Sequence, residues 1–298
     1  MFRMILHMSR LLVCACILNA CIHESVQQLE QDYEICFDVA TGSLTKSVED
    51  PATYRQDVPV KVWARLQDEA QANRFIIEGE VAHYRDGLWR TETQHFWPDS
   101  SYLSFNVFSP ADADAAFSAD QLGISFYGLD SKKDSSFRCT MLTEKYRKPD
   151  AEGPVSVLLY SPLSRLEFSA FSSAVDDVDI YVTRITLLGL FTKGDFSSSP
   201  EFTWSELRDI EDQLVFEGRT LLSEYPVNLG EGISIIPQDL KIKVEYEYTS
   251  YPSGAVSHGE SVVSCGNVMK PEIGKLRSYL LKISTDFVGI QKPKKYEE

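Results

Sequence analysis

The chain of 298 residues has few of the side chains and motifs on which most enzymes depend. It contains five histidines, and it has no HExxH, GxSxG, Walker-type or GxGxxG pattern of the kind that marks catalytic and nucleotide-binding sites. Carboxylate pairs are easily found among 44 Asp and Glu residues, so they are no evidence for a hydrolase. The sequence therefore predicts a protein that is not an enzyme and that has no metal or cofactor.

Basic residues are also few, with 29 Lys and Arg against the 44 acids and a formal net charge of −15. Nucleic-acid binding depends on a basic stripe that neutralises phosphates, whereas a surface of this charge repels them. Nucleic acid is thus excluded as an expected partner. The length suffices for one large or two medium domains, each able to bury a core.

No apolar run is long enough to span a bilayer, and the one clear run lies near the start of the chain. Residues 11–18 are apolar and follow basic residues, which is the pattern of an export signal. The run ends in Leu18-Asn19-Ala20-Cys21, which resembles the lipobox of bacterial lipoproteins, where the cysteine receives lipid before the signal is cut.

We therefore expect residues 1–20 to be a lipoprotein signal peptide and Cys21 to carry the lipid. Several acyl chains on one residue hold a protein at a membrane, whereas a single chain binds only marginally. The expected location is the outer membrane at the cell surface. The alternative is an ordinary signal peptide that is cut near Ala20 and followed by an incidental cysteine.

Three further cysteines follow a polar tether over residues 21–34. Cys36, Cys139 and Cys265 are far apart in sequence and show no CxxC spacing. An odd number does not favour a disulfide framework. One bridge between two of them, or three small buried thiols, are both open readings.

Beyond the tether, short segments of alternating apolar and polar residues are separated by turn residues, a pattern typical of an all-β sandwich. Residues 58–66 and 240–248 alternate most clearly, and the second segment should have one face in water. Asp86-Gly87 and Lys193-Gly194-Asp195 predict turns. Further strands are expected at 75–83, 102–108, 154–160, 166–171, 180–188, 233–237 and 276–284.

One short helix is expected after these turns. Thr203 and Glu206 have the spacing of a capping box, and Leu207, Ile210 and Leu214 follow at helical intervals. A decorated loop is the alternative for this segment. The acidic residues 176–179 lie about halfway along the chain and predict a boundary between a domain over 35–178 and a domain over 179–298.

Four groups of segments, taken in chain order, carry a resemblance. They are Ile35–Val39 with Leu44–Lys46; Phe96–Pro98 with Leu103–Phe105 and Ser109-Pro110; Leu166–Ala174 with Ile185–Gly189; and Ile233–Gln238 with Ile242–Tyr246 and Tyr279–Ile283. In this order they resemble the fimbrillin-like (Mfa-like) family, the lipoprotein subunits of type V pili in Gram-negative bacteria. Each motif alone occurs in many β proteins, so the order carries the resemblance.

The resemblance implies two tandem β-sandwich domains of transthyretin-like topology with few short helices. It implies a fimbrial subunit that polymerises with other pilin subunits, is held in the outer membrane by its lipid, and serves in adhesion and biofilm by meeting a host or bacterial surface. Stalk, tip and anchor positions in the pilus are all open.

The resemblance also implies a route of assembly. In pilus-forming members a trypsin-like protease removes the first strand, and a strand of the neighbouring subunit fills the groove by β-augmentation. Carried over to this chain, Cys36–Val39 begins the removable strand, Lys46 or Arg55 is the cleavage position, and Leu276–Ile290 is the donor. Lys46 stands where the family usually has an arginine, which leaves the protease open.

A different class of function is a monomeric surface lipoprotein that binds carbohydrate or another ligand through exposed aromatic rings. Its candidate platforms are Trp63, Trp89, Trp97 and Trp204. Because Trp63 and Trp89 adjoin alternating strands and Trp97 precedes a proline, core packing is the favoured role of these rings.

We expect Cys21→Ser to move the protein from the membrane fraction to soluble fractions, because the variant has no thiol to receive lipid. Fractionation of cells followed by immunoblotting measures this. A variant that stays with the membranes would contradict the lipid anchor.

Overall fold

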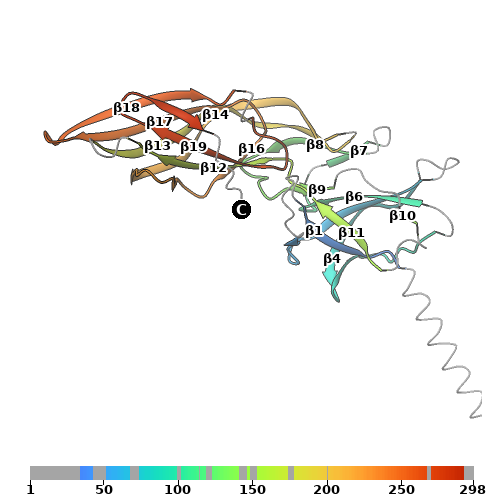
Figure 1. Cartoon of the computed structure of the whole chain (residues 1–298). Coiled ribbons are helices and arrows are strands. Elements are labelled where there is room, and N and C mark those ends of the chain that lie inside the picture. Colours follow the sequence, from blue (N-terminus) through green and yellow to red (C-terminus); the bar gives the residue numbers. More distant parts are fainter. Residues whose placement is uncertain are drawn as a thin grey trace, which may run out of the picture.

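The computed structural model describes residues 34–42, 52–67, 74–98, 102–113, 115–118, 123–140, 146–147, 153–173, 178–199, 201–266 and 270–291. These residues form strands, turns and loops, and the strands make up three sheets (Figure 1). The predicted all-β class is confirmed. None of these residues is helical, so the expected short helices are not found among them. In this part of the chain no helix is long and apolar enough to cross a bilayer.

The first sheet, sheet I, has nine strands. They are β1 (Phe37–Thr41), β2 (Ala52–Thr53), β3 (Val60–Leu66), β4 (Phe75–Arg85), β5 (Leu88–Thr91), β6 (Tyr102–Ser109), β9 (Arg138–Cys139), β10 (Tyr146–Arg147) and β11 (Val155–Leu159). Their order is β10-β6-β3-β4-β5-β1-β11, while β2 pairs with β1 and β9 with β6. Cys139 and Tyr160 exchange backbone hydrogen bonds of 3.0 and 2.8 Å, which link β9 to the end of β11. The sheet is therefore curled, and its inner face encloses a core.

Two further sheets lie over one another. Sheet II contains β7 (Ala115–Ser118), β8 (Gly123–Asp130), β13 (Val178–Ser197), β14 (Thr203–Leu221), β17 (Lys241–Ser250) and β18 (Ala255–Ser264). Sheet III contains β12 (Ser164–Phe171), β15 (Val227–Asn228), β16 (Ile233–Ile235), β19 (Leu276–Ile283) and β20 (Val288–Gln291). One cluster of buried residues takes side chains from both sheets, as the sandwich interpretation requires.

A third cluster joins sheet I to sheet II, and we call it the aromatic junction. Its rings are Trp63, Phe108, Phe126, Phe137 and Phe196, which come from both sheets and from the loop between β8 and β9. Phe126 packs edge-on against Phe108 with ring centroids 5.0 Å apart, and against Phe137 at 4.5 Å. Such edge-to-face pairs stabilise beyond the burial of their area.

Most predicted strands are confirmed, with ends shifted by a few residues. β3 covers Val60–Leu66 of the first predicted segment, and β17 begins at Lys241 in the second. In β17 the apolar residues Ile242, Val244 and Tyr246 are buried and alternate with partly exposed polar residues, as expected. Asp86 and Gly87 both have positive φ, at 52° and 88°, as a two-residue hairpin turn between β4 and β5 requires. Both sides of β3 are covered, because Trp63 and Arg65 are buried as well as the apolar residues that alternate with them.

Two local predictions are wrong. Lys193-Gly194-Asp195 lies inside β13 and does not close a turn. Residues 203–214 belong to β14, a strand of 19 residues, and form no helix. The β13–β14 ladder is shifted at several points, and Glu206 and Asp209 have positive φ. These bulges break the two-residue period, so the apolar residues fall at intervals that imitate a helix.

Sheet pairing crosses the predicted domain boundary. From the range 35–178, β7 and β8 belong to sheet II, where β8 pairs with β13, and β12 pairs with β19 in sheet III. Of the acidic segment 176–179, Asp176 and Asp177 lie outside the described part of the chain, and the boundary after residue 178 stays a prediction. Hydrogen bonds between the two ranges mean that a cut there would leave them held together.

Phe126→Ala should lower the free energy of unfolding by about 3 to 5 kcal/mol, because it leaves a cavity in the aromatic junction. Tyr127→Ala is the matched control on the same strand, since Tyr127 is 57 % exposed, and a change within about 0.5 kcal/mol is expected. Denaturant unfolding followed by tryptophan fluorescence compares them. Equal effects of the two substitutions would show that the junction does not stabilise the fold.

Candidate functional site

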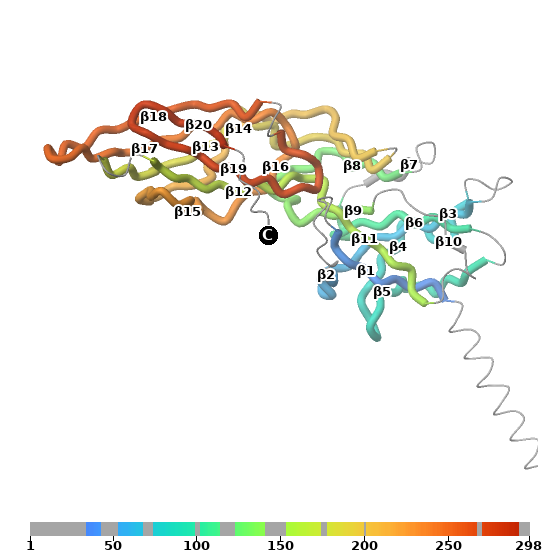
Figure 2. The backbone as a smooth tube through the Cα atoms, in the orientation of Figure 1, coloured from blue at the N-terminus to red at the C-terminus, as the bar shows by residue number. Residues whose placement is uncertain are grey.

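The first described strand lies inside sheet I, between strands that come much later in the chain. β1 runs parallel to β11 over five residue pairs, from Phe37 opposite Val155 to Thr41 opposite Leu159. Its other edge pairs antiparallel with β5 at Phe37 and with β2 at Ala40 and Thr41. Figure 2 shows β1 and β11 side by side. Both edges of β1 are therefore used in hydrogen bonding.

Alternate side chains of this segment enter the core of sheet I. Ile35, Phe37 and Val39 are at most 1 % exposed, whereas Asp38 points to solvent. The ring of Phe37 packs edge-on against Phe105 with centroids 5.6 Å apart. This spacing of two residues is what a strand needs to place three apolar side chains in one core.

Polar contacts fix the register of the segment. The backbone N–H of Ile35 donates to His95 O at 2.8 Å, that of Val155 donates to Cys36 O at 2.8 Å, and that of Tyr54 donates to Val39 O at 3.1 Å. Glu34 forms an ion pair with Arg90 of β5. Without residues 34–41, β5 and β11 would face one another across a groove with unpaired backbone groups and an exposed Phe105.

Of the predicted lipidation and cleavage positions, Arg55 is the one that lies in the described part of the chain. Cys21 and Lys46 lie outside the described residues. Arg55 is in the turn between β2 and β3, where its side chain is 69 % exposed and donates to Asp57 Oδ2 at 2.7 Å. Arg55 is thus accessible to a protein that approaches from solvent, and its hydrogen bond with Asp57 raises its pKa further.

The predicted donor segment is built into sheet III. β19 pairs in parallel with β12 over seven residues and antiparallel with β20. Tyr279, Leu281 and Ile283 are fully buried in the sandwich. In this structure the segment therefore completes the sandwich of its own chain.

The tryptophans proposed as ligand platforms lie in cores. Trp63, Trp89 and Trp97 are 7 %, 1 % and 6 % exposed. Trp204 is half-buried against Phe196, and its indole N–H donates to Pro162 O at 3.0 Å. Packing is thus the role of these rings, and the described surface offers none of the first three to a ligand.

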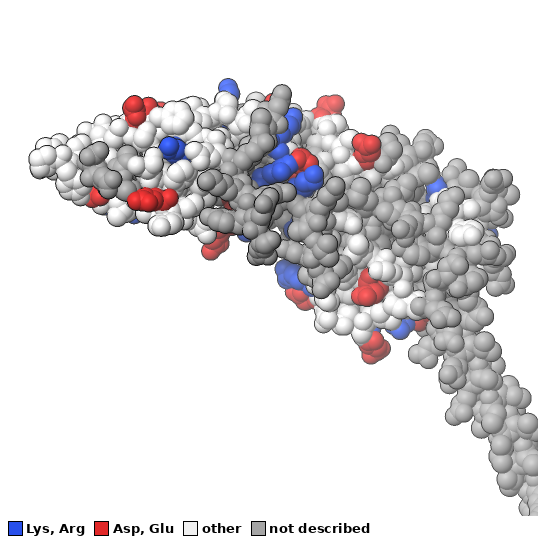
Figure 3. Space-filling view, viewed as in Figure 1, with Lys and Arg blue, Asp and Glu red and all other residues white. Residues whose placement is uncertain are grey.

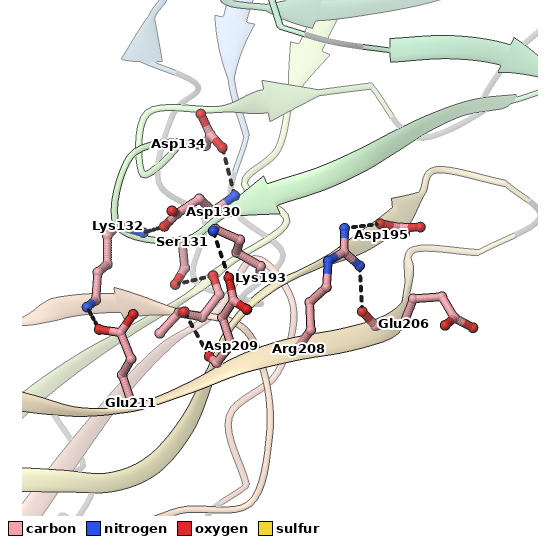
Figure 4. Close-up of polar contacts among 11 residues, drawn as sticks. Asp130, Ser131, Lys132, Asp134, Lys193, Asp195, Glu206, Arg208, Asp209 and Glu211 are labelled. Carbon is pink, nitrogen blue, oxygen red and sulfur yellow. Dashed lines mark hydrogen bonds and ion pairs between the residues drawn. The ribbon is translucent and has the colours of Figure 1, made fainter.

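A group of charged residues ties β14 to β13 and to the loop after β8 (Figure 4). Lys193 Nζ lies 2.7 Å from Asp209 Oδ2, Arg208 Nη2 lies 2.9 Å from Asp195 Oδ1, and Lys132 pairs with Glu211. The hydrogen bond from Lys193 lowers the pKa of Asp209. Each of these carboxylates has a cationic partner, so the group stabilises the strand edge. Among the described residues no three His, Cys, Asp or Glu gather in a way that could hold a metal.

The chain is similar in structure to bacterial surface proteins. No family model and no curated protein matches its sequence. A fimbrial protein from Bacteroides vulgatus superimposes with a TM-score of 0.57 at 14 % identity, over 87 % of this chain and 98 % of that one. A candidate cell adhesion protein from Parabacteroides distasonis gives a TM-score of 0.52 at 10 % identity, over 87 % and 96 %.

The chain has the fold of a fimbrial protein. At these identities the likeness concerns the fold, and it covers both sheet I and the sandwich of sheets II and III. The fold implied by the four groups of sequence segments is thereby confirmed. The match extends over most of this chain and nearly the whole of each neighbour.

Cys36, Cys139 and Cys265 are free thiols in this fimbrial fold. Cys139 is fully buried, and burial raises its pKa. Burial also raises the pKa of Cys265, to about 11, although a hydrogen bond with Tyr279 opposes the shift. Cys36 is partly exposed, and its pKa is raised mainly by burial. The structure thus favours the second of the two readings left open by the sequence, namely separate thiols.

Iodoacetamide at pH 8 should leave Cys139 and Cys265 of the folded protein unlabelled and label Cys36 slowly. A thiol of pKa 11 is about one-thousandth ionised at this pH, against about a quarter for an ordinary cysteine. All three should react at once after denaturation without reductant. Peptide mass spectrometry counts the labels, and thiols that become reactive only after reduction would instead indicate a disulfide.

Proposed function

We propose that the protein is a lipid-anchored fimbrial subunit that assembles by strand complementation and serves in adhesion at the outer membrane surface. It needs no catalytic residue or cofactor for this role. One observation carries the proposal: an N-terminal strand occupies the interior of a sheet and is followed by an exposed arginine in a turn. A strand of this kind can be cut from the chain while the rest of the sheet stays connected.

Cleavage after Lys46 or Arg55 would separate β1 from β3 and from the remainder of sheet I. Cleavage after Arg55 would also release β2, which pairs with β1. The freed strand is held only by hydrogen bonds and packing, so a competing strand can replace it. The groove between β5 and β11 then accepts a strand of a neighbouring subunit by β-augmentation.

The size of the interaction suits a durable joint. Each buried side chain at the positions of Ile35, Phe37 and Val39 contributes about 1.5 to 3 kcal/mol, and each ladder hydrogen bond about 1 kcal/mol net. The conformational entropy that the incoming strand loses on binding offsets part of this favourable free energy. A donor must therefore supply apolar side chains at every second residue, as β1 does.

The proposed donor, Leu276–Ile290, meets this requirement. Tyr279, Leu281 and Ile283 repeat the spacing of Ile35, Phe37 and Val39. Since β19 lies between β12 and β20, it must leave its own sheet before it can enter a neighbour. β20 is at the edge of sheet III, and among the described strands it pairs only with β19, so its release costs least and would come first.

Assembled fibres should contain chains that begin at Ser47 or Gln56, as N-terminal sequencing would determine. Substituting both Lys46→Ala and Arg55→Ala should keep Cys21 on the chain and prevent incorporation into fibres, because β1 then continues to fill its own groove. Arg85→Ala, which removes an exposed arginine beside the β4–β5 turn, is the matched control and should assemble normally.

If fibres of the unsubstituted protein contained chains that begin at Cys21, the proposed cleavage would be wrong. An unprocessed anchor or tip subunit would then replace the present proposal. Electron microscopy of cells with and without the gene separates these outcomes from a protein with no part in fibres, because loss or shortening of fibres is expected only for a fimbrial subunit.

A further inference from the structure

The two long outer strands of the sandwich differ in how their free edges are protected. β14 pairs with β13 through four shifts of register, and positive φ values at Glu206 and Asp209 mark its bulges. Its exposed side chains include seven charged residues, namely Glu206, Arg208, Asp209, Glu211, Asp212, Glu217 and Arg219. Bulges and charges of this kind prevent an edge strand from pairing with another chain.

β18 has none of this protection. It pairs with β17 over ten consecutive residues without a shift, and within the described residues no other strand pairs with it. Figure 2 shows it along the outer side of the sandwich. Its ten residues include one Glu and no Lys, Arg, Asp or Pro, while Val256 and Val262 are 56 % and 52 % exposed. A regular, weakly charged edge with exposed valines is suited to accept a further strand.

The sequence of β18 is complementary to itself when it is reversed about Gly259. Val256 then falls opposite Val262, Ser257 opposite Ser261, and His258 opposite Glu260. The outer face of the strand carries Val256, His258, Glu260 and Val262, all of them exposed. An antiparallel copy centred on Gly259 would therefore place two valine pairs and two His–Glu pairs on one face.

We propose that β18 pairs antiparallel with β18 of a second copy of this chain, with the two-fold axis at Gly259. The pairing joins the sheet II of one copy to the sheet II of the other in one continuous sheet. The interface is isologous, because both copies contribute the same surface. A residue i of one copy that lies opposite residue j of the other has its equivalent on the other side of the axis, where j of the first copy lies opposite i of the second. It lies on the sandwich of sheets II and III, away from the groove of β1.

Alternative registers are less favourable. A shift by one residue would turn the outer face of one copy toward the inner face of the other. Centring the pair on His258 sets that imidazole against its own copy, and centring it on Glu260 sets two carboxylates against each other. Like charges directly opposite destabilise a strand pair, so Gly259 is the favoured centre.

The charge of the surrounding surface permits this contact. The chain as a whole carries −15, which opposes association. The β17–β18 hairpin, however, ends in the uncharged residues 250–257, and the corresponding end of the molecule is free of charged side chains on the face seen in Figure 3. Lys243 Nζ also lies 2.9 Å from Glu260 Oε2 and offsets its charge beside the axis.

Cysteine cross-linking of the full chain in mild detergent tests both the partner and the register. Val256→Cys and Val262→Cys chains should form a disulfide-linked dimer when they are mixed under oxidised glutathione, because opposite residues lie within disulfide distance. Neither variant alone should cross-link, since identical positions would be about 20 Å apart along the strand. Non-reducing electrophoresis measures the dimer.

Leu214→Cys on the protected edge β14 is the matched control, and it should not cross-link when mixed with Val262→Cys. Absence of the mixed dimer, or equal cross-linking of each variant with itself, overturns the proposal. Cross-linking of Val262→Cys in intact cells to a different protein would also overturn it, because the occupant would then be another partner.

Charge exchange gives an independent test. His258→Glu should weaken dimerisation about tenfold, because two carboxylate pairs then face one another. Adding Glu260→Lys places a lysine opposite each introduced glutamate and should recover the affinity. Sedimentation velocity over a concentration series measures the dimer, and circular dichroism verifies folding. If the double variant were as weak as His258→Glu alone, the proposed register would be wrong.

Discussion

The backbone of β1 is hydrogen-bonded along both edges, and the closed form of sheet I depends on it. β5 and β2 hold one edge and β11 holds the other, so this short segment joins β5 to β11, whose other described backbone link to the sheet is the bridge between Cys139 and Tyr160. A central strand of this kind cannot be removed without exposing both hydrogen-bonding groups and apolar side chains. A strand that replaced β1 would need apolar residues at alternate positions to restore what β1 provides.

The three hydrophobic clusters connect this groove to the rest of the molecule. The core of sheet I and the core of the sandwich are separate, while the aromatic junction contacts strands of both sheet I and sheet II. Trp63 illustrates the connection, since β3 places its neighbours in the core of sheet I and the ring itself in the junction. Both faces of β3 are therefore buried. Packed side chains connect the core of sheet I to the aromatic junction and through it to sheet II.

Sequence reasoning identified the fold class and most strands because alternation with a period of two is a local signal. It failed where the long-range ladder decides the conformation. β14 has the composition of an exposed, charged helix, and its strand conformation follows from pairing with β13, with bulges that conceal the period. The sequence favoured core packing for Trp63 but did not reveal its partners, because Phe108 and Phe126 come from distant strands.

For the candidate site, the sequence indicated the segment after Cys36, and the structure adds its position inside the sheet. The parallel partner was not predictable, because β11 lies more than a hundred residues further along and no local pattern links it to β1. The self-complementarity of β18 is visible in the sequence only after the structure has shown which residues face outward and that the edge is free.

The parallel pairing of β1 with β11 also determines when sheet I can close. A chain that enters its folding compartment from the N-terminus presents residues 37–41 long before residues 155–159 arrive, so the first strand made waits for one of the last strands of its sheet. Contacts so distant in sequence slow folding, because the entropy lost on closing the loop precedes the stabilisation. During this delay the apolar side chains of β1 are not yet covered by the core of sheet I.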